Sequence, residues 1–206
     1  MLPNFLRDTV KHRSVARFSV SGIIAILDAL YKDLRKNHTE GYVTEVGFVL
    51  AELDHTIKSL KNWAKPKKVG TAMFHAVATS HVYNDPYGVV YIVGPWNYPF
   101  QLVIAPLIGA IAAGNCSVVK PSEIASHTGR LVEQLLNDNF DEGFVKAVYG
   151  GIEESTALLE QKFDYIFFTG GTGIGKIFYQ AAAKNLTPVT LELGGKSPCI
   201  IGNKFH

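Results

Sequence analysis

The sequence predicts an α/β fold: a doubly wound parallel sheet with a helical hairpin at its N-terminal side. Short apolar segments alternate with helical segments from residue 88 to residue 201, as in βαβ units. Apolar residues at helical spacing form a stripe between residues 43 and 60. A glycine-rich turn at residues 167–176 joins an apolar strand to a helix. These features predict a helical hairpin at 1–66, an extended linker at 67–87 and an α/β region at 88–206.

The composition narrows the class of protein. The 206 residues are 47% hydrophobic and 18% charged, which is typical of a globular chain with a core. The formal charge of +2 shows no clustered basic excess, so we expect neither nucleic acid nor an anionic membrane surface as a partner. The longest uncharged apolar run, Val103–Ala113, is too short for a transmembrane segment. Two cysteines, Cys116 and Cys199, are typical of a reducing cytoplasm rather than of a disulfide-rich secreted scaffold.

Residues 18–64 are predicted to form two helices that end before Pro66. A hairpin packed on its own domain is favoured over a coiled coil, because the stripe spans fewer than about four heptads. A secretory signal around Phe18–Leu27 is the alternative for the first helix, but Asp28 follows it at once. The apolar positions at helical spacing are Val20, Ile23, Leu27, Leu30 and Leu34, then Val43, Val46, Leu50, Leu53, Ile57 and Leu60.

The remaining elements follow from apolar runs and their glycine or proline boundaries. Residues 70–83 alternate weakly and are expected to be extended. Ser122 is expected to cap the helix that runs to about residue 138. The predicted strands are 88–94, 117–119, 144–149, 164–169, 189–193 and 198–201, and the predicted helices are 100–113, 122–138, 153–161 and 174–183.

The glycine turn has three interpretations. A dinucleotide fingerprint G-x-G-x-x-G is not met, because Lys176 or Phe178 stands at the sixth position. A P-loop is nearly met by Gly170 to Lys176, but Ile177 stands where a hydroxyl would bind Mg²⁺. A turn that binds nothing is the third possibility, since glycine-rich turns are common.

The turn gains meaning from the other blocks in the chain. Five segments of the chain resemble the aldehyde dehydrogenase family in their residues, their order and their separation. They are Gly94–Phe100, Gly109–Asn115, Lys120–Glu123, Phe168–Gly170 and Leu191–Pro198. The resemblance runs from about residue 29 to residue 201 and is strongest to the class 3 branch. It implies the Rossmann-like cofactor domain of that fold and NAD or NADP as cofactor. It also implies a medium- or long-chain fatty or an aromatic aldehyde as substrate, and a homodimer for a full-length relative.

The resemblance assigns roles to particular residues. Asn97 would donate its amide to the oxyanion that forms on the aldehyde oxygen. Lys120 and Glu123 would bind the adenosine ribose, with Trp96 nearby, and the glycine turn would lie near the pyrophosphate. Without the resemblance, Asn97 is a turn asparagine and Glu123 an acid that suits a helix N-terminus. No metal site is expected. The turn residues assigned to the cofactor are Thr169, Gly170, Gly171, Thr172, Gly173, Ile174 and Gly175.

Glu192 is, by the same resemblance, the general base that activates water for hydrolysis of a thioester. It ends an apolar strand beside Gly194, where partial burial would help it to accept a proton. A carboxylate paired with Lys196 is the alternative.

The nucleophile is expected to be missing. In the family the catalytic cysteine lies downstream of the Leu191–Pro198 block, and this chain ends at His206. Cys116 and Cys199 are expected in or beside strands and are interpreted as structural. We therefore expect a truncated chain of an oxidoreductase, or alternatively a non-catalytic dinucleotide-binding remnant or interaction fragment.

Overall fold

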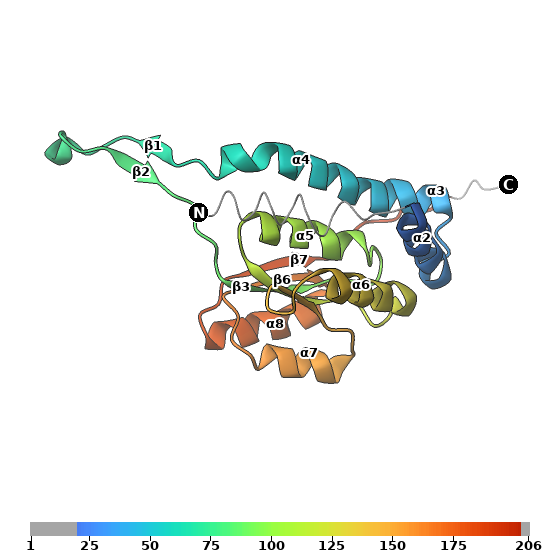
Figure 1. Cartoon of the computed structure of the whole chain (residues 1–206). Coiled ribbons are helices and arrows are strands. Elements are labelled where there is room, and N and C mark those ends of the chain that lie inside the picture. Colours follow the sequence, from blue (N-terminus) through green and yellow to red (C-terminus); the bar gives the residue numbers. More distant parts are fainter. Residues whose placement is uncertain (1–19, 203–206) are drawn as a thin grey trace.

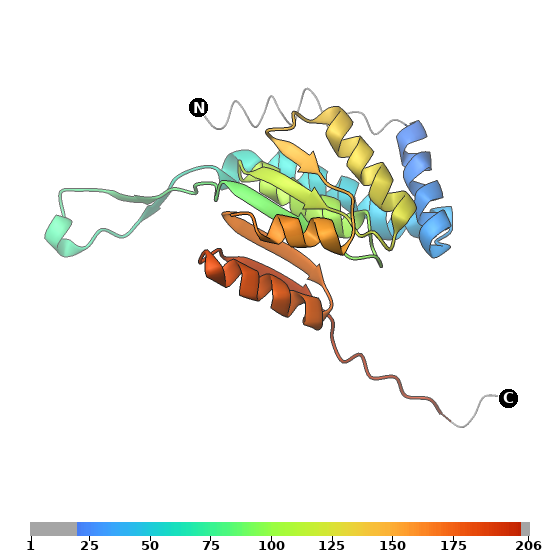
Figure 2. The same ribbon diagram turned by 90° about the horizontal axis from the view of Figure 1, so that it is seen from below.

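The computed structural model describes residues 20–202, so the first two residues of the signal-like segment Phe18–Leu27 lie outside the described part. Within it, the central element is a five-stranded parallel sheet with the order β5-β4-β3-β6-β7 (Figures 1 and 2). Its strands are β3 (Val89–Val93), β4 (Cys116–Lys120), β5 (Val145–Ala147), β6 (Tyr165–Gly170) and β7 (Val189–Leu193). The helices between them are α5 (Gln101–Ala112), α6 (Ser126–Asn139), α7 (Ile152–Leu159) and α8 (Thr172–Lys184).

The sheet is doubly wound, which confirms the predicted fold class. From β3 the chain passes through α5, β4 and α6 to β5, and these helices cover one face (Figure 1). It then returns to the other side of β3 as β6, and α7 and α8 cover the opposite face. The direction of winding therefore changes between β3 and β6, and a crevice opens at the carboxyl ends of strands at such a point.

Strand β3 shows why the sheet has two cores. Its side chains alternate, so Val90 and Ile92 pack with α5 and α6, whereas Tyr91 packs with Phe163 and Phe178 on the α8 side. A strand covered on both faces is apolar at every position, which is the continuous run that predicted it.

The helical hairpin consists of α2 (Val20–Leu34) and α4 (Gly47–Trp63), joined through α3 (His38–Gly41) and a π-helical turn, Tyr42–Val46. The predicted stripe on the second helix is partly wrong. Val43 is 66% exposed and Ile57 is also exposed, whereas Val49 and Thr56 are buried. The π turn adds a residue to one helical turn, so the buried face shifts in register.

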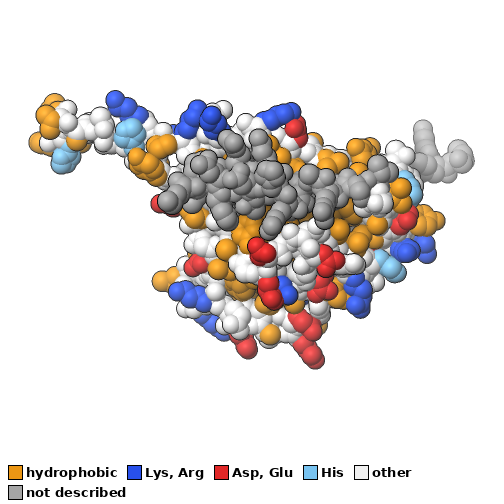
Figure 3. Space-filling model, viewed as in Figure 1, with side chains coloured by type: hydrophobic (Ala, Val, Ile, Leu, Met, Phe, Trp, Pro, Cys, Tyr) orange, Lys and Arg blue, Asp and Glu red, His pale blue; other side chains and the backbone are white. Residues whose placement is uncertain are grey.

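The segment expected to be an extended linker is an antiparallel hairpin. Strand β1 (Lys67–Val69) pairs with β2 (Ser80–Val82), and a short 3₁₀ turn, Met73–His75, lies between them. The hairpin projects from the body in Figure 1, and Figure 3 shows apolar side chains at its end. Phe74 and Val77 there are almost fully exposed.

Two local predictions are wrong. Ser122 does not cap helix α6, which begins at Ser126; the Ser122 hydroxyl instead accepts a hydrogen bond from Ile124 N at 3.3 Å. Residues 198–201 form no strand, because they run on beyond the sheet without a partner.

The N-terminus of α6 is capped by Asp33 of α2. Its carboxylate accepts hydrogen bonds from His127 N at 3.1 Å and Thr128 N at 2.7 Å, and it contacts His127 Nδ1 at 2.8 Å. Burial of the carboxylate acts to raise its pKa, but the hydrogen bonds from Thr128 and His127 outweigh burial and hold the pKa of Asp33 below its usual value.

We expect Asp33→Ala to lower the free energy of unfolding by about 0.5–2 kcal/mol at pH 7, as other lost helix caps do. Because the folded pKa is lowered, this contribution is present above the unfolded pKa and is lost as pH falls through the folded value. Urea unfolding of the parent and the variant, from pH 7 to about pH 3, measures it. A difference between them that stays constant down to the lowest pH would contradict the assignment.

Candidate active site

A large cleft lies at the carboxyl ends of β3, β4, β6 and β7, where the winding of the sheet reverses. Its volume is about 1070 Å³. The cleft brings together all the site residues predicted from the sequence except Gly173 and Gly175, which do not line it. Those on the lining are Trp96, Asn97, Lys120, Glu123, Thr169, Gly170, Gly171, Thr172, Ile174 and Glu192.

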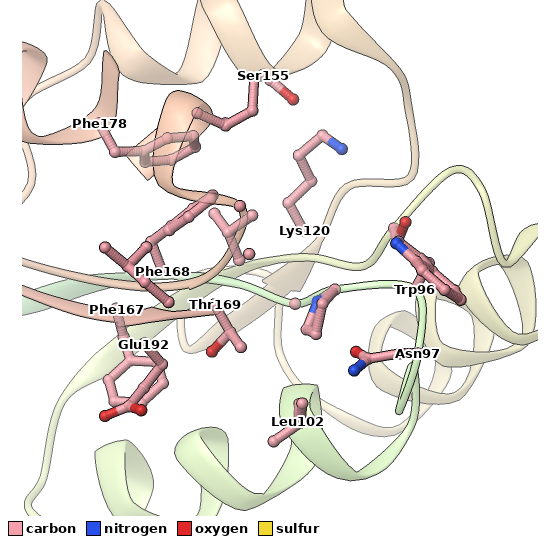
Figure 4. A pocket seen from close by; sticks show the side chains of 18 of the residues that line it. Trp96, Asn97, Leu102, Lys120, Ser155, Phe167, Phe168, Thr169, Phe178 and Glu192 are labelled. Atoms are coloured by element: carbon pink, nitrogen blue, oxygen red, sulfur yellow. The ribbon is translucent and has the colours of Figure 1, made fainter. Parts of the chain in front are cut away.

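Figure 4 shows that the cleft has two sides. Lys120 and Ser155 lie on one side, whereas Asn97, Leu102, Thr169 and Glu192 lie on the other. Lys120 ends strand β4 and its side chain is only 3% exposed, with Nζ 3.3 Å from the Glu123 carboxylate. A buried cation beside a half-exposed carboxylate presents both a donor and an acceptor, which suits vicinal hydroxyls.

The N-terminus of α8 faces the cleft. The N-cap residue of α8 is Gly171, which has no side chain that could accept a hydrogen bond from the first N–H groups of the helix. These N–H groups are therefore available to an anion. A Cβ added at Gly171 would meet no atom within 4 Å, which leaves open space for a ligand. Gly175 lets α8 pack closely on β7, because a Cβ there would lie 2.8 Å from the side chain of Leu193.

The hydroxyl group of Thr169 also fits a cleft that binds a polar ligand. Its hydroxyl oxygen is buried and, within residues 20–202, has no hydrogen-bond partner. It lies at the end of β6 and on the wall of the cleft (Figure 4). A buried hydroxyl without a partner is costly, and a ligand in the cleft could supply one.

Asn97 lies in the loop between β3 and α5. Its Oδ1 accepts a hydrogen bond from Tyr98 N at 3.1 Å, which orients the amide. In the described part of the chain the Nδ2 group donates to no other residue. The side chain is exposed to the cleft, so the amide can donate to a ligand oxygen.

Glu192 lies on β7, in register with Thr169 of β6. The expected partial burial is not found, because its side chain is exposed in the cleft. Among the described residues it forms no ion pair with Lys196, which was the alternative interpretation. β7 is the edge strand, so the last residues of the strand have no further neighbour to cover them.

The structure adds cleft residues that sequence reasoning missed. Helix α7 contributes the apolar residues Ile152 and Leu159 with Ser155 between them, and α8 contributes Ile177. Ile152 is 81% exposed and Ile177 is also exposed. Ile152, at the start of α7, was the available signal, because ligand clefts are lined mainly by apolar side chains.

Neither cysteine lines the cleft. Cys116 begins β4, at the amino end of the sheet, and is partly buried. Cys199 is exposed and lies after the last strand, so the expectation that it sits inside a strand is wrong.

Neither a metal centre nor a membrane span is found among the described residues. His, Cys, Asp and Glu side chains there do not gather in groups of three or more that could hold a metal ion. No helix in residues 20–202 combines the length and the apolar character needed to cross a bilayer.

Comparison with known proteins decides the family. The sequence model of the Aldehyde dehydrogenase family matches residues 23–205. The chain belongs to this family. Among curated aldehyde dehydrogenases, the chain is 51% identical over 176 residues to 4,4'-diaponeurosporen-aldehyde dehydrogenase of Staphylococcus aureus, with 85% of this chain and 38% of that protein covered. It is 48% identical to the mouse (Mus musculus) aldehyde dehydrogenase described as dimeric and NADP-preferring, with 85% and 39% covered.

A solved aldehyde dehydrogenase structure supports the same assignment. The substrate-bound state of Staphylococcus aureus AldH superposes with a TM-score of 0.87 at 46% identity, and the match covers 95% of this chain and 42% of that one. The chain thus spans well under half the length of the aldehyde dehydrogenases it matches.

Proposed function

We propose that the cleft is part of an enzyme that oxidises an aldehyde to a carboxylic acid with NAD or NADP, through a cysteine thiohemiacetal and thioester. The observation that carries the proposal is the single cleft that holds Lys120 and Glu123, the α8 N-terminus, Asn97 and Glu192. Membership of the aldehyde dehydrogenase family supports it. The proposed substrate is a medium- or long-chain fatty aldehyde or an aromatic aldehyde.

The residues of the cleft fit a dinucleotide. Lys120 and Glu123 would bind the ribose hydroxyls, and the exposed apolar side chains of Ile152 and Ile177 on the cleft lining would contact the adenine. The free N–H groups at Gly171 and Thr172 would face the pyrophosphate. When bound, the cofactor accepts the hydride that leaves the aldehyde carbon. Trp96 is exposed at the rim between the two sides of the cleft.

The other side of the cleft carries the polar groups for the reaction. The Nδ2 group of Asn97 would donate a hydrogen bond to the substrate oxygen as it gains negative charge. The exposed Glu192 carboxylate would accept a proton from the water that hydrolyses the thioester. The thiol that this chemistry requires is expected from outside the cleft residues, since neither Cys116 nor Cys199 lines the cleft. The homodimer proposed for the whole protein would cover the exposed apolar end of the β1–β2 hairpin.

The alternative function is binding of a dinucleotide without catalysis. Both functions require a dinucleotide site, so cofactor binding alone does not distinguish them. A P-loop nucleotidase is disfavoured, because Ile177 lines the cleft where a Mg²⁺-binding hydroxyl would be needed.

Titration calorimetry of the 206-residue chain tests the binding site. We expect heat with NAD or NADP, and Lys120→Met to weaken the binding about tenfold, because a charge-assisted hydrogen bond is lost. Lys184→Met, at the far end of α8, is the matched control and should bind as the parent does. Equal affinity of the Lys120 variant, or binding of ATP with Mg²⁺ in preference to both dinucleotides, would contradict the proposed site.

A further inference from the structure

The strongest feature outside the cleft is a buried ion pair behind the Asn97 loop. Lys36 Nζ lies 2.6 Å from Glu45 Oε1, and the Glu45 residue is 0% exposed. Glu45 belongs to the π-helical turn before α4, and Lys36 lies between α2 and α3. Neither residue lines the cleft, and no motif in the sequence indicated either of them.

Each partner of the pair also binds the loop that carries Asn97. The second oxygen of Glu45 accepts hydrogen bonds from Phe100 N at 2.9 Å and Gln101 N at 3.1 Å, so the carboxylate caps helix α5. Lys36 Nζ donates to the carbonyl oxygen of Asn97 at 2.9 Å and lies 3.9 Å from the centroid of the Tyr98 ring. One pair of charges therefore holds both ends of the segment 97–101.

Both charged groups of the buried pair have several interaction partners. The carboxylate has three donors, and the ammonium has two oxygen acceptors and a ring face. Arg35, next to Lys36, has a φ of 58°, a left-handed conformation that side chains rarely adopt. Arg35 directly follows α2 and its N–H donates to the Tyr31 carbonyl, so this conformation ends the helix one residue before Lys36.

We propose that Lys36 and Glu45 are positioning residues, which fix the backbone of the Asn97 loop so that the Asn97 amide is held towards the cleft. The catalytic consequence rests on the role proposed above for Asn97. The fixing of the loop backbone by Lys36 and Glu45 does not depend on that role.

Trp96 reports on that loop. The chain has two tryptophans, and Trp63→Phe leaves Trp96 as the only one. In this background we expect Lys36→Met to increase acrylamide quenching of Trp96 emission, because the Asn97 carbonyl loses its donor. Asp33→Ala removes the carboxylate of α2 that caps α6, and it does not touch the Asn97 loop. This variant is the control for general destabilisation and should leave the quenching unchanged.

The double variant Lys36→Met/Glu45→Gln covers the case in which the single variant fails to fold. It leaves no buried charge unpaired, and the glutamine keeps an acceptor for the start of α5. Quenching in the folded double variant equal to that of the parent would overturn the proposal.

The catalytic consequence is measured in the whole enzyme. The double variant should lower kcat about 100-fold, as small misplacements of catalytic groups do, while KM for the aldehyde stays unchanged. Increased quenching together with an unchanged kcat would support the positioning of the Asn97 loop by Lys36 and Glu45, and it would overturn the role of Asn97 in the reaction. A rise in KM alone would overturn the positioning effect on the reaction.

Discussion

Glu192→Gln is expected to lower steady-state turnover of the whole enzyme about 100- to 10,000-fold, the usual contribution of a general base. Glutamine keeps the shape of the side chain but cannot accept a proton from water. Glu192 is exposed in the cleft and lies in register with Thr169, so the substitution should leave the sheet and the cofactor side unchanged.

The step that fails can be identified by rapid mixing. Because hydride transfer precedes hydrolysis, the variant should still release one equivalent of reduced cofactor in a burst and then stall as the thioester accumulates. Glu160→Gln, at the exposed end of α7, is the control and should turn over as the parent does. Loss of the burst together with the steady state, or parental turnover, would contradict the assignment of Glu192 as the base.

Glu45→Ala is expected to lower the free energy of unfolding by about 3–5 kcal/mol, the range for removal of one partner from a buried ion pair. The substitution leaves the Lys36 ammonium buried without its counter-ion and removes the carboxylate that accepts hydrogen bonds from Phe100 N and Gln101 N at the start of α5. The Lys36 ammonium would keep the Asn97 carbonyl and the Tyr98 ring, but it would lose the only carboxylate that the structure places beside it among the described residues.

An exposed ion pair on the same hairpin provides the matched control. Lys58 and Asp54 are one turn apart on α4, 2.5 Å from nitrogen to oxygen, and both side chains are mostly exposed. Asp54→Ala should therefore cost less than about 1 kcal/mol. Urea unfolding of the 206-residue chain measures both variants. A loss for Glu45→Ala no greater than that for Asp54→Ala would show that the buried pair contributes little.

Local signals predicted most of the fold. Strand β3 was visible as an apolar run between glycines, and helix α8 as an amphipathic segment after a glycine turn. The alternation of such segments implied parallel strands and helices on both faces, because a crossover between parallel strands has one preferred hand. The hydrophobic periodicity of an element and the glycine or proline residues that bound it lie within a short stretch of sequence, so both can be identified without the structure.

The errors in the fold came from contacts that no local pattern contains. Val43 was placed on the buried stripe, but the π turn at Tyr42–Val46 shifts the register. Ser122 was expected to cap α6, but the cap is Asp33, some ninety residues earlier in the chain.

The sequence by itself determined the family, the succession of strands and helices from β3 to β7, and the candidate groups Asn97, Lys120 and Glu192, because each lies in a contiguous motif. Only the tertiary structure decided that these motifs meet in one cleft, because they come from different strands and meet where the winding reverses. It alone revealed the Lys36–Glu45 pair, whose partners at Asn97 and Phe100 lie more than fifty residues away. A buried charge is stable only where distant groups converge on it, and that convergence is a property of the folded chain.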